Sequence, residues 1–250
     1  METDSSTVYA TPLIFLVALL YSMVGHGGGS GYIAVLTFLH GDPDFISTTG
    51  LSLNLMVSSI AFLNFRRSGH FDPSILLPFV ITSIPASFVG GYIRVEKTVF
   101  SLILGTALLL SAVRLFLEFA PQHNYRNRVP FHGGLILGLL IGFVSGITGI
   151  GGGVFLSPLL IFLRWADPKK TAAVSSAFIF INSLSGLSAR FVKFGFSLPY
   201  TVDIGVFAVA VVIGGYIGSF LASHRFKVPV LQKALALTLT VAGIKLLIAR

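Results

Sequence analysis

Two glycine-rich stretches decide how this chain folds: VGHGGGSG at residues 24–31 and GITGIGGG at residues 146–153. Each lies inside a long apolar segment and contains three consecutive glycines. A glycine costs a helix interior about 1 kcal/mol relative to alanine, so we expect both helices to break there. Non-helical backbone is tolerated at membrane depth only where protein or a water-filled cavity satisfies its polar groups. A second interpretation stays open, in which the glycines only let helices pack closely.

The composition is that of a membrane protein. Of 250 residues, 54% are hydrophobic and 10% are charged, whereas soluble proteins carry roughly 25% charged residues. This excludes a cytosolic enzyme, a disordered chain and a disulfide scaffold. The absence of cysteine excludes Cys-ligated zinc, iron–sulfur clusters and thiol catalysis. The net charge of +8 is better explained by basic loops beside membrane spans than by a nucleic-acid partner.

Apolar runs of the length that a spanning helix needs, about 20 residues, predict an all-α membrane protein with one domain over residues 1–250. We expect about eight hydrophobic segments joined by short loops, and the two longest are those that contain the triple glycines. The segments are residues 10–40, 47–65, 74–93, 98–118, 132–163, 171–192, 200–222 and 230–248.

The two halves of the chain repeat each other at a constant offset. Gly25, Gly27, Gly28 and Gly29 recur 124 positions later as Gly149, Gly151, Gly152 and Gly153, and the GGYI of residues 90–93 recurs at 214–217. Two motifs in one register make chance an implausible explanation. We therefore expect two homologous halves, about 10–118 and 132–248. Duplicated halves are the usual plan of secondary transporters, with the substrate site between them.

Loop charges favour an inverted repeat. If all eight segments cross the membrane, the 17 Lys and Arg divide nine against eight. If each glycine-broken segment is instead a re-entrant hairpin, each half crosses three times and the division becomes eleven against six. Only the second division has the positive-inside bias, which places both termini outside the cell. We expect a multi-pass protein of the cytoplasmic membrane.

The glycine breaks are the candidate substrate site. Glycines before a helix N-terminus let free N–H groups converge on an anion, and the helix dipole adds to the attraction. His26 could bond the anion or carry a proton, although any polar group here could instead serve only as interhelical glue. Arg66 and Arg190 are candidates for anion guidance or for plain interface anchors. The candidate binding residues are Gly25, His26, Gly27, Gly28, Gly29, Ser30, Ser52, Asn54, Thr148, Gly149, Gly151, Gly152, Gly153, Ser176 and Asn182.

Other chemistries lack the residues that they need. No Asp or Glu stands in the middle of a segment, which argues against a carboxylate proton relay, a metalloprotease and an aspartyl protease. No βαβ unit surrounds the glycines, so a dinucleotide site is not expected. We expect no enzyme activity, no metal and no cofactor other than a coupling ion, H⁺ or Na⁺.

The duplicated four-segment half, the GxGGG motif near its start and the GGYI motif later in it resemble the TauE/SafE family of membrane permeases. The resemblance covers about residues 10–248. It implies transport of small sulfur-containing anions such as sulfite or sulfoacetate, with residues 25–31 and 149–153 as binding positions. Since Ile150 stands where His26 stands in the first motif, the two halves cannot contribute equally.

These observations predict a secondary transporter for a small oxyanion, sulfite or an organosulfonate, that works by alternating access. An anion channel without ion coupling is the alternative, and a membrane enzyme or assembly factor is a more remote one. The expected partners are the small anionic substrate and the lipid bilayer, with no nucleic acid, and a homodimer remains open.

Overall fold

The computed structural model describes residues 5–23, 27–39, 42–93, 95–116, 125–126, 128–194, 201–224 and 229–248. These residues form ten α-helices, and no strand occurs among them. The predicted all-α class is therefore confirmed. The helices are α1 (Ser5–Met23), α2 (Gly29–Leu39), α3 (Pro43–Arg67), α4 (Pro73–Tyr92), α5 (Lys97–Phe116), α6 (Phe131–Thr148), α7 (Gly153–Phe162), α8 (Pro168–Phe194), α9 (Thr201–His224) and α10 (Pro229–Ile248).

Aspartate side chains set where the long helices begin. Asp42 accepts hydrogen bonds from the backbone N–H groups of Asp44 and Phe45 at the start of α3. Asp72 accepts one from Ser74 at the start of α4. In each helix a proline occupies the first position, where the missing N–H costs nothing. Such caps satisfy backbone donors that would otherwise lack a partner.

Both apolar segments with triple glycines are divided into two helices. The second segment stops being helical after Thr148 and resumes at Gly153, and the first resumes at Gly29. The helices after the breaks, α2 and α7, have 11 and 10 residues. At 1.5 Å per residue, each spans about half a bilayer.

In both broken segments, residues after the break lie beside residues before it. The backbone N–H of Arg126, just before α6, donates to the carbonyl of Arg164, just after α7, at 2.8 Å. The end of α7 therefore lies beside the start of α6. In the first segment, Tyr21 of α1 and Ser30 of α2 share a 2.8 Å hydrogen bond between their hydroxyls, and Gly31 packs against Val17 one turn earlier in α1.

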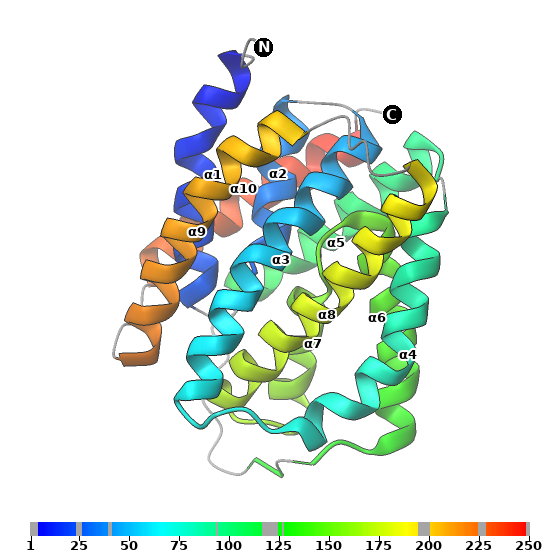
Figure 1. Ribbon diagram of the computed structural model, residues 1–250, viewed down its shortest axis with the longest axis vertical. Coiled ribbons are helices and arrows are strands. Elements are labelled where there is room, and N and C mark those ends of the chain that lie inside the picture. Colours follow the sequence, from blue (N-terminus) through cyan, green and yellow to red (C-terminus); the bar gives the residue numbers. More distant parts are fainter. Residues whose placement is uncertain are drawn as a thin grey trace.

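The helices exchange partners between the halves. Helix α1 packs along α9, and its counterpart α6 packs along α4. Between them α3 and α8 cross antiparallel, because Asp44 at the start of α3 contacts Arg190 near the end of α8. Ala61 and Phe65 near the end of α3 pack on Ala172 and Ala173 near the start of α8. Figure 1 shows α1 and α9 on one flank, α4 and α6 on the other, and α3 and α8 between them.

Glycines make this exchange possible by letting backbones touch. Gly138, Gly142 and Gly146 of α6 face the carbonyls of Phe79, Ser83 and Ser87 of α4, four residues apart on each helix. The repeated GGYI motif acts in the same way. Gly90 faces α6 and Gly91 faces α8, while Gly214 faces α1 and Gly215 faces α3. Small residues with this role are typical of helix contacts in membranes.

The outside of the bundle is apolar. Five of the described helices are long and apolar enough to cross a membrane, namely Pro43–Arg67, Pro73–Tyr92, Phe131–Thr148, Pro168–Lys193 and Ile204–Leu221. Large apolar side chains such as Ile136, Val209 and Phe220 are exposed on them. The protein is therefore embedded in a membrane. The expected total of eight segments and the re-entrant, inverted topology stay predictions.

Candidate functional site

The two glycine breaks meet at Asn54, which lies in the middle of α3 and is completely buried. Its side-chain Nδ2 donates to the carbonyl of Gly149 in the second break at 3.0 Å. Its Oδ1 lies beside the first break, because a Cβ placed on Gly27 would sit 2.8 Å from it. A Cβ on Gly29 would collide with the Asn54 amide and with the carbonyl of Ile150. Residues far apart in sequence thus form one central cluster.

Equivalent glycines turn the chain in both breaks. Gly28 has φ +91° and Gly152 has φ +78°, a left-handed conformation that side chains with a Cβ rarely adopt. An aromatic ring lies against each of them: Tyr32 against Gly28, and Phe178 against Gly152. Any side chain at either position would be strained by its backbone and blocked by a ring.

The helices that follow the breaks point their N-termini toward this cluster. The first N–H groups of a helix have no acceptor within it and carry the positive end of its dipole. Two such termini, at Gly29 and at Gly153, begin beside Asn54 and Ile179. The arrangement can therefore present backbone donors to a small anion from both halves.

The remaining predicted polar residues are buried but differ in what they bond. The hydroxyls of Ser52, Thr148 and Ser176 donate to carbonyls of their own helices, and Ser30 bonds Tyr21. Asn182 donates from Nδ2 to the carbonyl of Phe178 at 2.9 Å, and its Oδ1 has no partner. Asn54 and Asn182 both face the protein interior, since both are 0% exposed. Gly25 and His26 lie outside the described residues.

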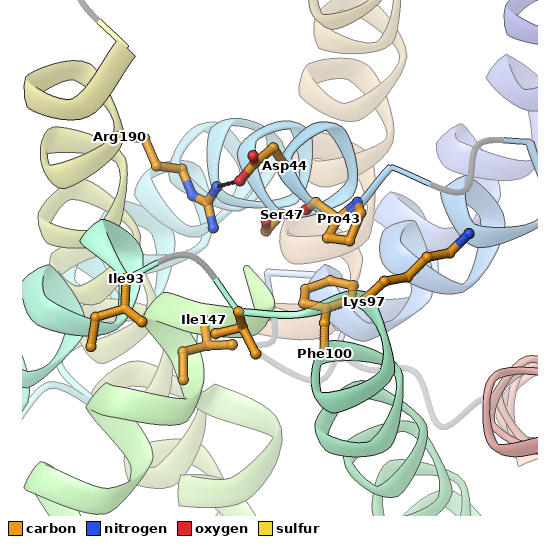
Figure 2. Close-up of a pocket in the computed structure, with 9 residues that line it drawn as sticks. Pro43, Asp44, Ser47, Ile93, Lys97, Phe100, Ile147 and Arg190 are labelled. Carbon is orange, nitrogen blue, oxygen red and sulfur yellow. Dashed lines mark hydrogen bonds and ion pairs between the residues drawn. The ribbon is translucent and has the colours of Figure 1, made fainter. Parts of the chain in front are cut away.

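The two predicted arginines occupy different environments. Arg66 is exposed, with its guanidinium 5.9 Å from the ring centre of Phe62. Arg190 is 3% exposed, and its Nη1 lies 3.2 Å from the carboxylate of Asp44. This ion pair lines a pocket of about 200 Å³ between α3, the start of α5 and the ends of α6 and α8 (Figure 2). Ile147 and Ser47 also line the pocket, and Ser47 contacts Gly149 of the second break.

Sequence reasoning left Tyr32 and Ser183 out of the candidate site. The Tyr32 hydroxyl and the Ser183 hydroxyl are buried without a hydrogen-bond partner. Ser183 lies 3.1 Å from the place where Gly151 would carry a Cβ. One signal was available in the sequence: Tyr32 follows Gly28 by four residues, so in a helix its ring returns to that glycine.

Comparison with known proteins finds membrane transporters. The family model described as "Sulfite exporter TauE/SafE" matches residues 10–246. "Probable membrane transporter protein y4hK" of Sinorhizobium fredii is 35% identical over 98% of this chain and 99% of its own length. "Probable membrane transporter protein YunE" of Bacillus subtilis is 24% identical over 87% of this chain and 88% of its own. No solved structure matches the chain.

The family match and the first of these relatives each cover nearly the whole chain, including both glycine breaks and both GGYI motifs. The predicted resemblance is thus confirmed: the chain belongs to the TauE/SafE sulfite exporter family of membrane transporters.

Proposed function

We propose that this protein is a secondary transporter that carries a small oxyanion, sulfite or an organosulfonate such as sulfoacetate, across the cytoplasmic membrane. The observation that carries the proposal is the meeting of the two glycine breaks at Asn54, through the Asn54–Gly149 hydrogen bond and the contacts with Gly27 and Gly29. Helices that begin at Gly29 and Gly153, one in each half, start near this residue, which supports a substrate site between the repeats.

The chain path supports an inverted repeat with hairpins. The bond from Arg126 to Arg164 brings the end of the second hairpin back to where it began. A two-fold rotation that exchanges the halves would convert the pair α1–α9 into α6–α4. It would also map the antiparallel pair α3–α8 onto itself, which requires an axis across these helices. In a bilayer such an axis lies in the membrane plane, and the halves then have opposite orientations.

The two ends of the α3–α8 crossing differ, as expected for a transporter open to one side only. At one end the pocket beside Asp44 and Arg190 reaches down to Ile147, next to the second break. At the other end Phe65 and Ala173 belong to a closed apolar cluster with Ala61, Ala172 and Phe71. We propose that the anion enters the central site from the pocket, and that the apolar cluster parts to release it on the other side.

Uptake of radiolabelled sulfite and sulfoacetate into proteoliposomes tests this function. Saturable uptake that follows a proton or sodium gradient is the expected result and identifies the coupling ion. Flux that neither saturates nor responds to an ion gradient would instead indicate an anion channel. No uptake of either compound by folded protein would remove the sulfur anions from the proposal.

A further inference from the structure

The orientation of the Asn54 amide is fixed by its partner. A carbonyl oxygen can only accept hydrogen bonds, so the amide nitrogen of Asn54 must be the atom that faces Gly149 O at 3.0 Å. The opposite assignment would place two acceptors against each other. Oδ1 is consequently the other end of the amide, and it is buried without a hydrogen-bond partner.

This free oxygen lies inside the proposed anion site. Cβ atoms placed on Gly27 and Gly29 would lie 2.8 Å and 2.9 Å from it, so it borders the first break directly. A second buried amide has the same character, since Asn182 also donates from Nδ2 and leaves its Oδ1 unbonded. The site therefore combines backbone donors with at least one acceptor.

The unbonded Oδ1 of Asn54 disfavours binding of an anion whose oxygens can only accept hydrogen bonds. A buried polar atom without a partner costs about 1–3 kcal/mol, and a second negative oxygen close to Oδ1 would add repulsion. A ligand that carries one O–H removes both penalties, because it donates to Oδ1 while its charged oxygens accept from the N–H groups of the breaks.

Resting on the proposed function, we infer that the transported species is a monoprotonated oxyanion whose O–H donates to Asn54 Oδ1. Sulfite takes up a proton close to neutral pH, whereas a sulfonate group stays deprotonated. The inference therefore favours hydrogensulfite over organosulfonates as the substrate.

The proton then travels on the substrate. Each hydrogensulfite that crosses carries one proton with it, and the protein needs no titrating carboxylate to couple the two. Among the described helices no Asp or Glu lies in the middle of a helix, which agrees with this route. The same feature disfavours a sodium ion at Oδ1, because a cation buried without a carboxylate is costly.

Competition in proteoliposomes with the same pH on both sides tests the inference. Uptake of radiolabelled sulfite is measured on either side of neutral pH, with unlabelled sulfite or methanesulfonate as competitor. Methanesulfonate has one negative charge and a similar head group but no O–H. We expect apparent affinity to follow the hydrogensulfite concentration, and methanesulfonate to compete about tenfold less well than hydrogensulfite, the factor that one hydrogen bond supplies.

The variant Asn54→Leu removes the acceptor. Hydrogensulfite and methanesulfonate should then compete about equally well, whatever the effect of the substitution on the maximal rate. Asn64→Leu is the matched control. Asn64 lies on the same helix and donates to Ser219 at 2.8 Å, away from the breaks, so its variant should keep the wild-type preference. If Asn54→Leu does not fold, the wild-type competition and pH series decide alone.

Three results would overturn the inference. Methanesulfonate that competes as well as hydrogensulfite would show that no substrate proton is needed, while leaving the transporter intact. Uptake that needs sodium and shows no preference between the two competitors would place a cation at Oδ1. If no anion is taken up saturably, the proposed function fails and this inference fails with it.

Discussion

The guanidinium of Arg190, near the end of α8, lies 3.2 Å from the carboxylate of Asp44, in the first turn of α3. The two residues stand 146 positions apart, one in each half of the chain. Arg190 also reaches Thr48, whose hydroxyl lies 3.5 Å from Nη1. One ion pair thus joins the two halves at the rim of the pocket.

Removing the charge of Asp44 should destabilise the protein, because Arg190 is buried and would lose its counter-charge. We expect Asp44→Asn to lower the free energy of unfolding by about 2 kcal/mol, less than for a fully buried pair because Asp44 is partly exposed. Unfolding in detergent micelles measures it. Arg66→Gln, at the exposed position equivalent to Arg190, should change stability by less than about 0.5 kcal/mol. Equal losses in the two variants would contradict this account of the pair.

Gly152→Ala should abolish transport. Its backbone has φ +78°, and the new Cβ would lie 2.8 Å from the ring of Phe178, so the second break must distort. Gly69→Ala separates the backbone strain from the clash with a neighbour. Gly69 has φ +76°, but a Cβ there would have no atom within 4 Å. Both variants carry about 1 kcal/mol of backbone strain, and only the first should lose sulfite uptake in proteoliposomes. Similar uptake by both would argue against the break as the binding site.

Enlarging a glycine between α6 and α4 should separate these helices. In Gly142→Leu the Cβ alone would lie 2.6 Å from the Cα of Ser83. Overpacking of this kind typically costs 1–3 kcal/mol or more, so we expect a loss of at least about 3 kcal/mol or no folded protein. Size-exclusion chromatography and thermal unfolding in detergent measure the effect. Gly205→Leu, where a Cβ meets nothing within 4 Å, is the control and should behave as wild type.

Single cysteines at Arg126 and Arg164 should react with an impermeant thiol reagent from the same side of the membrane. Both side chains are exposed, and the backbone of the first bonds the backbone of the second. If all eight segments crossed the bilayer, these positions would lie on opposite sides. The chain has no natural cysteine, so no background thiol interferes. Labelling from opposite sides would rule out the hairpin topology.

Local sequence signals were sufficient for the all-α class and for the helix breaks. The sequence predicted that both helices break at the triple glycines, and α2 and α7 begin at the last glycine of each, Gly29 and Gly153. Glycine is unfavourable in a helix wherever it stands, so this signal needs no knowledge of the neighbours. Burial of Asn54 and Asn182 was predictable for a similar reason, because an exposed amide in a lipid environment is costly.

Interactions between the halves were not predictable in this way. The GGYI motif indicated a duplication, but its role as a contact with the opposite half depends on which helices become neighbours. The partner of Arg190 likewise depends on the crossing of α3 and α8. Arg66 is the equivalent of Arg190 in the first half. The residue equivalent to Asp44 in the second half is Pro168, which has no charge to offer Arg66. Sequence reasoning therefore gave Arg66 and Arg190 the same candidate role, whereas the fold exposes the first and buries the second in an ion pair.

The exchange of partners also governs how the protein can be made. Helix α1 is synthesised first, yet the helix that it packs along, α9, ends at residue 224. Synthesis must therefore be nearly complete before α1 can pack along α9, and until then the face of α1 around Phe15 and Leu19 lacks its partner helix. Two separately expressed fragments, divided between α5 and α6, should consequently assemble into a working protein, whereas neither fragment alone contains a finished helix bundle.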